Sequence, residues 1–141
     1  MRRTFTAVLC ALVLQSCADY QTRREILDEH RPDSLAELRE LTLAPYRDWQ
    51  QQVPRDCHSP KLLDARASVL NTALMIKPGR DGFEAAYDAA SWMLDVAEGA
   101  AANGCVATAR DLYIKVRGLY TGSGYVRLRE RASVGVERLG S

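Results

Sequence analysis

Apolar residues recur at helical spacing along most of the chain from about residue 34 onward. Residues 59–76 carry a broad apolar face, residues 83–102 carry two, and residues 105–119 and 125–139 carry one each. No stretch alternates apolar and polar residues with a period of two, which is the pattern of a half-buried strand. The pattern therefore predicts an all-α fold.

Proline, glycine and asparagine divide this helical pattern into segments. Ser59 and Pro60 have the form of an N-cap followed by the first helical residue. Asn103-Gly104 and residues 121–124 predict breaks between the later helices, and residues 78–82 predict a turn by composition. Connections this short favour antiparallel neighbours, so we expect a small bundle of stacked helical hairpins.

The first helix of this bundle is expected to run from residue 34 to Pro54. Ser34 and Glu37 have the spacing of a capping box, in which each side chain satisfies a free amide of the first turn. Pro45 is expected to kink or split the helix, because it has no amide hydrogen to donate. The expected buried stripe consists of Leu35, Leu38, Leu41, Pro45 and Trp49.

One hairpin, at residues 93–113, resembles a tetratricopeptide unit. Ala97 and Ala109 stand where the two helices of that repeat approach closely, and Tyr113 follows Ala109 by four residues, as the aromatic of the repeat does. The first helix lacks the family's Leu-Gly pair, and no proline closes the second helix. The resemblance implies a repeat array, whereas the rest of the chain favours a compact bundle of hairpins.

The N-terminal residues 1–16 have the form of a secretion signal. Arg2 and Arg3 supply the charged start, and the apolar run of residues 5–14 is too short to cross a bilayer as a helix. Leu14-Gln15-Ser16-Cys17 resembles the lipobox of bacterial lipoproteins. This resemblance implies cleavage before Cys17, a diacylglycerol thioether on its sulfur and acylation of the new amino terminus. An ordinary signal peptide with an incidental cysteine is the alternative.

The residue after the cysteine bears on the final location. Ala18 stands where an aspartate would signal retention in the inner membrane, so the chain resembles the outer-membrane class of lipoproteins. Several acyl chains anchor a protein stably. We expect a signal peptide at 1–16, a lipidated tether or short helix at 17–33, and a single helical domain at 34–141, held on the outer membrane and facing the periplasm.

Removal of the signal peptide would also change the net charge and the number of cysteines that can pair. The whole chain carries a formal charge of +1, and loss of Arg2 and Arg3 would bring it to −1, which argues against a strongly basic nucleic-acid binder. Once Cys10 has left with the signal peptide and Cys17 carries lipid, Cys57 and Cys105 are the cysteines that remain. In an oxidising periplasm they predict one disulfide, worth about 3–4 kcal/mol by loop closure, with two buried free thiols as the alternative.

Candidates for catalysis or cofactor binding are few. His30 and His58 are the only histidines, and with Cys57 they form no ligand set of metal-binding spacing. Gly122-Ser123-Gly124 has neither the preceding strand nor the histidine partner of a serine hydrolase. We therefore expect no metal, no cofactor and no catalytic activity.

Charge is distributed unevenly, and the C-terminal part is basic. Arg127, Arg131 and Arg138 fall on one side of the last predicted helix, where guanidinium groups suit a partner rich in carboxylates or phosphates. A solvated outer face is the alternative. Trp92, on the second apolar face of residues 83–102, is expected to border a groove for a partner segment.

These features together favour an adaptor or assembly factor of an envelope complex. The expected contacts are the membrane, through lipid on Cys17, and an envelope protein, with no nucleic acid. Secretin pilotins are similar in class, as small lipidated helical proteins, and the analogy rests on class alone. One alternative is a peptidoglycan-acting or other envelope hydrolase, which would need a cleft with two acids of divergent pKa. Another is a structural or stress lipoprotein.

Overall fold

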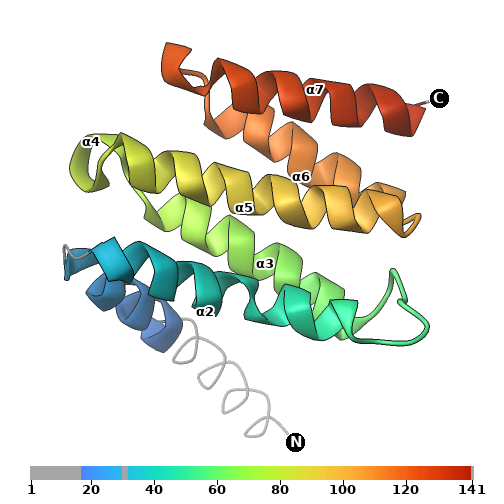
Figure 1. Ribbon diagram of the computed structural model, residues 1–141, viewed down its shortest axis with the longest axis horizontal. Coiled ribbons are helices and arrows are strands. Elements are labelled where there is room, and N and C mark those ends of the chain that lie inside the picture. The colour runs from blue at the N-terminus through green and yellow to red at the C-terminus, as the bar shows by residue number, and fades with distance from the viewer. Residues whose placement is uncertain (1–16, 30–31, 141) are drawn as a thin grey trace, which may run out of the picture. The chain divides into compact units, whose positions relative to one another are not determined.

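The structure is a computed structural model that describes residues 17–29 and 32–140, and all regular structure within these ranges is helical (Figure 1). Residues 17–28 are helical. The prediction of an all-α fold is confirmed. The labelled helices are α2 (Pro32–Gln50), α3 (Pro60–Met75), α4 (Pro78–Asp81), α5 (Phe83–Ala102), α6 (Val106–Leu119) and α7 (Val126–Gly140), with the 3-10 turn η1 (Ser123–Tyr125) before α7.

The chain forms two compact units, residues 1–38 and 39–141, whose boundary lies inside α2. The second unit thus begins a few residues after the domain start expected at residue 34. In the first unit, the stretch expected to be a tether or short helix is helical over residues 17–28. The signal peptide expected at residues 1–16 lies outside the described residues.

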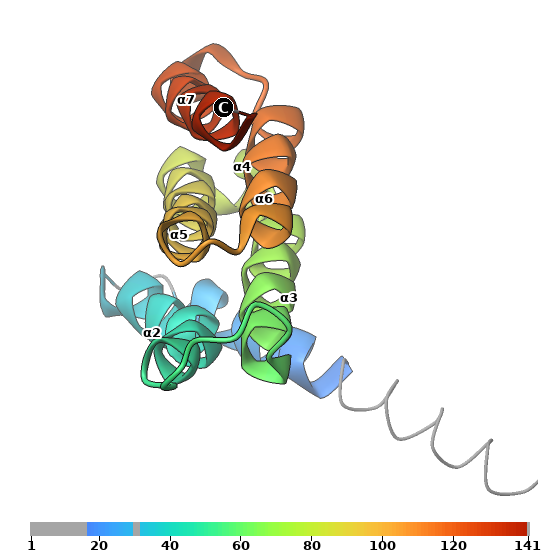
Figure 2. The same ribbon diagram turned by 90° about the vertical axis from the view of Figure 1, so that its right-hand side faces the viewer.

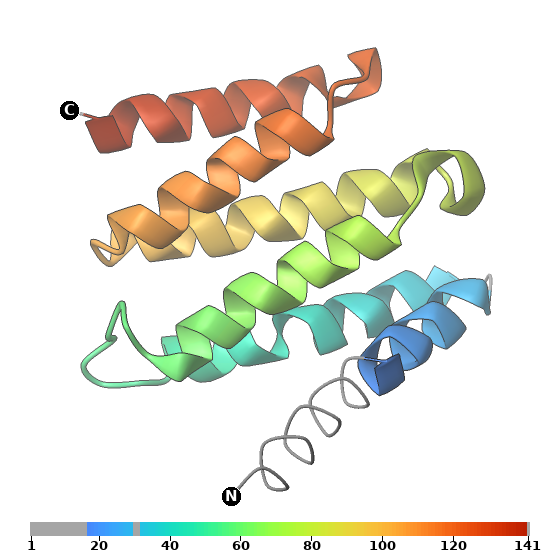
Figure 3. The ribbon, with the colours of Figure 1, turned by 180° about the vertical axis from the view of Figure 1, so that it is seen from behind.

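In the second unit, α5 is the central helix and packs against α3, α6 and α7. Figure 2 shows α3 and α6 in one layer, with α5 and α7 beside them in the other. The view from behind (Figure 3) places α3 and α6 on the same side of α5, and the ion pair between Arg66 Nε and Asp111 Oδ2, 2.7 Å long, joins them. The prediction of stacked antiparallel hairpins is confirmed.

Burial on several sides explains the two apolar faces of α5. Its buried residues include six alanines, whose small side chains allow neighbouring helices to approach closely. The turn that follows is also explained by sequence. Gly104 has a φ of +75°, a conformation that favours glycine, and Asn103 Nδ2 donates to the carbonyl of Gly99 at 2.8 Å. The hairpin of α5 and α6 is therefore fixed by both packing and its turn.

The start of α3 is as predicted, and that of α2 is not. Ser59 Oγ accepts a hydrogen bond from the amide of Lys61 at 3.3 Å, and Pro60 is the first helical residue. Ser34, in contrast, is not an N-cap, because α2 already begins at Pro32. A proline suits the first helical position, since an amide hydrogen there would have no partner in the helix. The prediction of a capping box at Ser34 is therefore wrong.

The structure adds detail to two further expectations about turns and breaks. The helix α2 continues through Pro45 to Gln50 instead of splitting. Pro45 has no amide hydrogen to donate to the carbonyl of Leu41. Because Leu41 is 38% exposed, water can hydrate the helix at that point instead. Residues 78–81 form the single helical turn α4, which Gly82 follows, and the amide of Lys77 donates to Asp81 Oδ2 at 2.8 Å.

The buried stripe of the second unit contains a polar pair that the apolar pattern missed. Thr42 is fully buried, whereas Leu41 beside it is not. The hydroxyl groups of Thr42 and Thr72 are hydrogen-bonded at 2.9 Å, so their burial leaves neither without a partner. On α3, Leu63 and Leu74 are exposed, which makes its buried face narrower than the sequence indicated.

The predicted disulfide is confirmed. Cys57 and Cys105 are bonded, with their Cα atoms 5.1 Å apart and a sequence separation of 48. The bond joins the loop before α3 to the residue that precedes α6. Arg55 Nη1 reinforces this link by donating to Asn103 Oδ1 at 3.2 Å. The loop of residues 51–59 is thus held against the turn between α5 and α6.

Candidate functional site

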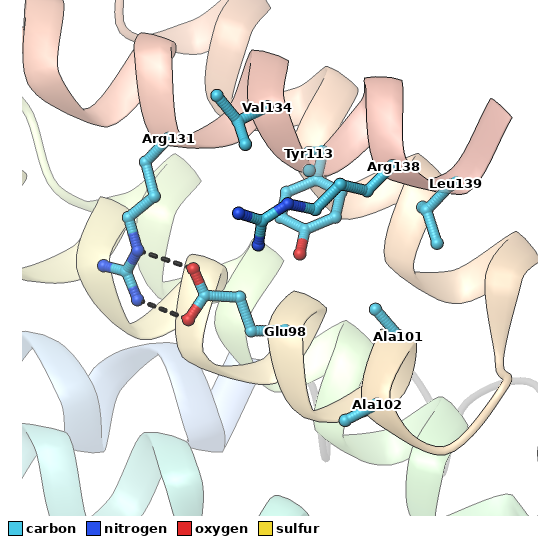
Figure 4. Close-up of a pocket in the computed structure, with 9 residues that line it drawn as sticks. Glu98, Ala101, Ala102, Tyr113, Arg131, Val134, Arg138 and Leu139 are labelled. Carbon is cyan, nitrogen blue, oxygen red and sulfur yellow. Dashed lines mark hydrogen bonds and ion pairs between the residues drawn. The ribbon is translucent and has the colours of Figure 1, made fainter. Parts of the chain in front are cut away.

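A pocket opens between α5, α6 and α7, at the C-terminal ends of α5 and α7 (Figure 4). Its volume of about 530 Å³ falls within the range of ligand-binding pockets in proteins. Glu98 and two alanines line it from α5, Tyr113 from α6, and the remaining lining residues come from α7. The pocket thus combines charged groups, an aromatic ring and small apolar side chains.

Arg131 closes one side of the pocket through a bidentate ion pair with Glu98. Its Nε lies 2.6 Å from Glu98 Oε1 and its Nη2 lies 2.7 Å from Glu98 Oε2, while Asp95 Oδ1 is 3.2 Å from the same Nη2. These hydrogen bonds, with that of Glu98 dominant, raise the pKa of Arg131. Since the pair is partly solvent-exposed, it stabilises the fold by no more than about 1 kcal/mol. Its clear effect is to tie α7 to α5.

Tyr113 forms the floor of the pocket beneath α7. The ring is buried, and a Cβ atom at Gly135 would overlap it, so only glycine at that position lets α7 lie this close to α6. Burial raises the pKa of the Tyr113 hydroxyl, and the charge of Glu98 raises it further. The ring therefore stays neutral and fixed beside the charged groups of the pocket.

Arg138 is the second arginine in the pocket lining, and its surroundings differ from those of Arg131. Its side chain is exposed, and within residues 17–29 and 32–140 it has no hydrogen bond or ion pair. Figure 4 shows its guanidinium extending from α7 into the space in front of the Tyr113 ring. Arg138 thus brings a charge into the pocket that no described carboxylate balances.

The three predicted arginines therefore do not act as one stripe. Arg131 and Arg138 both line the pocket, whereas Arg127 is exposed outside it. Glu98 and Tyr113 also line the pocket, and neither was predicted as a site residue. Nothing in the chain pattern links Glu98 to an arginine 33 residues later, so this part of the site had no local signal.

Trp92 does not border a groove, which corrects the expectation for this residue. It is 5% exposed and belongs to the buried face of α5, so almost none of its surface is open to a partner. A large aromatic ring on a helix packed on several sides is more stable in the core than at an edge. The open part of the surface lies instead at the end of α5 that carries Glu98.

Cys17 is exposed and carries no disulfide, unlike Cys57 and Cys105. Within the described part of the chain, no group of three or more histidine, cysteine, aspartate or glutamate side chains is placed to hold a metal ion. The same residues contain no helix that is both long and apolar enough to span a membrane. The cysteines and the pocket are therefore the features on which a function can be argued.

Comparisons with known proteins add no relative. No family model matches the chain, and neither a curated protein nor a solved structure is found to be similar to it. The resemblances to a lipobox and to a tetratricopeptide unit rest on the residues quoted above.

Proposed function

We propose that this protein is a lipid-anchored adaptor of the bacterial cell envelope, which binds another envelope protein and performs no chemistry on it. The observation that carries the proposal is the pocket between α5, α6 and α7, where Arg138 lacks an acidic partner within the described residues. A surface pocket with one unbalanced charge beside small apolar side chains is suited to recognising a segment of another protein.

The cysteines support the proposed location. The disulfide between Cys57 and Cys105 is typical of a protein that matures in an oxidising compartment such as the periplasm. Cys17 has a free and exposed sulfur, as lipid attachment requires. With Ala18 next to it, the proposed address is the outer membrane, with the helical domain facing the periplasm.

The composition of the pocket supports binding over hydrolysis. Glu98 is the one carboxylate among the lining residues, and both of its oxygens accept hydrogen bonds from Arg131. An acid–base hydrolase of the glycosidase type uses two carboxyl groups with different pKa values on either side of the bond that it cleaves. A carboxylate held by an arginine fork serves better as a wall of a recognition site.

Replacement of Cys17 tests the anchor. The Cys17→Ala variant should lose incorporation of a fatty-acid label and leave the membrane fraction or remain unprocessed, because the thioether cannot form. Cys10→Ala is the matched control, since that residue belongs to the expected signal, and it should behave like the unchanged protein. A Cys17→Ala variant that is still labelled and membrane-bound would show that the anchor is wrong.

Site-specific photo-crosslinking in cells tests the adaptor role. A photoreactive amino acid in place of Val134, which lines the pocket and is 43% exposed, should give one discrete protein adduct. The same amino acid in place of Leu74, an exposed residue of α3 outside the pocket lining, is the control and should not give it. If neither position gives an adduct, or both give the same one, the proposed docking site is wrong.

A further inference from the structure

The charges that line the pocket are not equivalent. Arg131 uses Nε and Nη2 on Glu98 and shares Nη2 with Asp95, so its charge is already balanced by α5. Arg138 lines the same pocket without an ion pair among the described residues. A ligand that enters with a negative charge would therefore gain more from Arg138 than from Arg131.

The apolar part of the pocket is small and open. Ala101 and Ala102 form it on α5, and Val134 and Leu139 form it on α7. Alanine side chains leave room above the helix, and the exposure of Val134 shows that the space opens at the surface. These four small to medium residues give a bulky apolar side chain a surface to cover. An open mouth also allows the chain that carries that side chain to pass on in both directions.

We propose that the pocket binds a peptide segment of the partner protein in which an acidic side chain stands next to a bulky apolar one. The carboxylate pairs with the Arg138 guanidinium, and the apolar side chain covers Ala101 and Ala102. The Tyr113 ring, fixed under Gly135, forms the floor between these two contacts. This inference rests on the proposed adaptor function and names the chemistry of its partner.

Charge and shape together favour this occupant over a lipid or a nucleic acid. One unbalanced arginine suits a single carboxylate, whereas a phosphate backbone is bound by rows of cations. The pocket is also open to solvent at Val134, which is 43% exposed, so a long alkyl chain in it would stay partly in contact with water. A single acidic residue beside a single apolar one matches what the walls provide.

Two blocked, fluorescently labelled peptides test the proposal with the full chain purified in detergent. Both have serine and glycine flanks; one carries Glu-Leu at its centre and the other Gln-Leu. Fluorescence anisotropy should show that the unchanged protein binds the Glu-Leu peptide about tenfold more tightly, as expected when one charge-assisted contact is lost. In Arg138→Gln this preference should disappear.

Arg127→Gln is the matched control. It removes the same charge from the same helix at an exposed position outside the pocket lining, so it should keep the preference for Glu-Leu. Circular dichroism of both variants should match that of the unchanged protein, because neither side chain is buried. Equal loss of preference in the two variants would reduce the effect to general electrostatic attraction and contradict the proposal.

The remaining outcomes also decide the question. Equal affinity for the two peptides, or no binding of either, would show that the acid–Arg138 contact is wrong. Binding of octanoate, without binding of either peptide, would make the pocket a site for a lipid carboxylate. If Arg138→Gln still gives the protein adduct through a photoreactive residue at position 134, the adaptor function stands and only the proposed ligand chemistry fails.

Discussion

The helices α5, α6 and α7 meet at two ends, and the two ends are built differently. Where α5 begins, Phe83, Tyr87, Tyr120 and Tyr125 pack together, with Phe83 and Tyr125 centred 5.0 Å apart and Tyr120 and Tyr125 centred 5.3 Å apart. Where α5 ends, alanines and charged side chains leave a pocket, and a disulfide stands beside the turn. Aromatic rings fill the space at the first end, whereas the pocket end carries a covalent bond and an ion pair.

The two ends differ in the size of the side chains that fill them. Aromatic rings fill the space between helices and contribute apolar burial, so their end needs little else. Small residues at the other end bury less apolar surface. The disulfide Cys57–Cys105 and the bidentate ion pair between Arg131 and Glu98 join the chain there. The pocket is therefore expected to depend on a few specific residues.

The largest expected effect comes from the disulfide. The double change Cys57→Ser with Cys105→Ser should lower the free energy of unfolding by about 3–4 kcal/mol, because the unfolded chain regains the entropy of a long open loop. Urea denaturation measures this loss, and the unchanged protein with its disulfide intact is the control. A double variant as stable as the control would show that the pocket end does not depend on the bond.

A smaller effect is expected where α7 crosses Tyr113. Gly135→Ala should cost about 1–3 kcal/mol in the free energy of unfolding, because the added methyl group overlaps the ring and must push α7 or the ring aside. Thermal unfolding measures the loss. Gly118→Ala is the matched control, since a Cβ atom there meets nothing within 4 Å, and it should leave stability unchanged or slightly raised. Equal effects in the two variants would contradict the close approach of α7.

The smallest effect is expected at the aromatic end. The Tyr120 hydroxyl is buried without a hydrogen-bond partner among the described residues, and burial strongly raises its pKa above the ordinary value of 10.0. Tyr120→Phe should therefore change the free energy of unfolding by no more than about 1 kcal/mol at neutral pH, in the stabilising direction.

The same variant has a pH signature. Because the folded-state pKa of Tyr120 is raised, its neutral form is favoured by folding, and stability is lost as pH rises above the unfolded value of about 10. Urea denaturation at pH 9 and at pH 11 should show a smaller loss for Tyr120→Phe than for the unchanged protein. Identical losses would mean that Tyr120 ionises as easily in the fold as in the unfolded chain.

The local sequence pattern predicted the helices well, but it could not predict contacts between residues that are distant in sequence. Helical spacing, Pro60 and Asn103-Gly104 marked real helices and ends, since these signals act within a few residues. The disulfide could also be predicted, because only two cysteines were left to pair once Cys10 was assigned to the expected signal peptide and Cys17 to lipid. The contacts Thr42–Thr72 and Glu98–Arg131 join residues 30 and 33 positions apart, so no local sequence signal could predict them.

The error at Trp92 has a specific cause. A helix that is apolar on two faces shows that two sides are suited to burial, but the pattern does not show which side a neighbour covers. In the fold, the neighbours of α5 cover Trp92, and the open space lies over Ala101 and Ala102 instead. The small residues Ala101 and Ala102 indicate the pocket, whereas a large aromatic residue such as Trp92 indicates the core.

The disulfide also divides the walls of the pocket into two kinds. The covalent ring closed by Cys57 and Cys105 contains all of α3, α4 and α5, whereas α7 lies outside it. The α5 wall is thus restrained even when the fold loosens. The α7 wall is held by packing, by the ion pair between Arg131 and Glu98, and by the hydrogen bond from Arg110 to the carbonyl of Leu139. Local opening should then begin with α7, whose amide hydrogens would exchange with solvent before those of α5. A partner that grips both walls would stabilise the part of the domain that opens first.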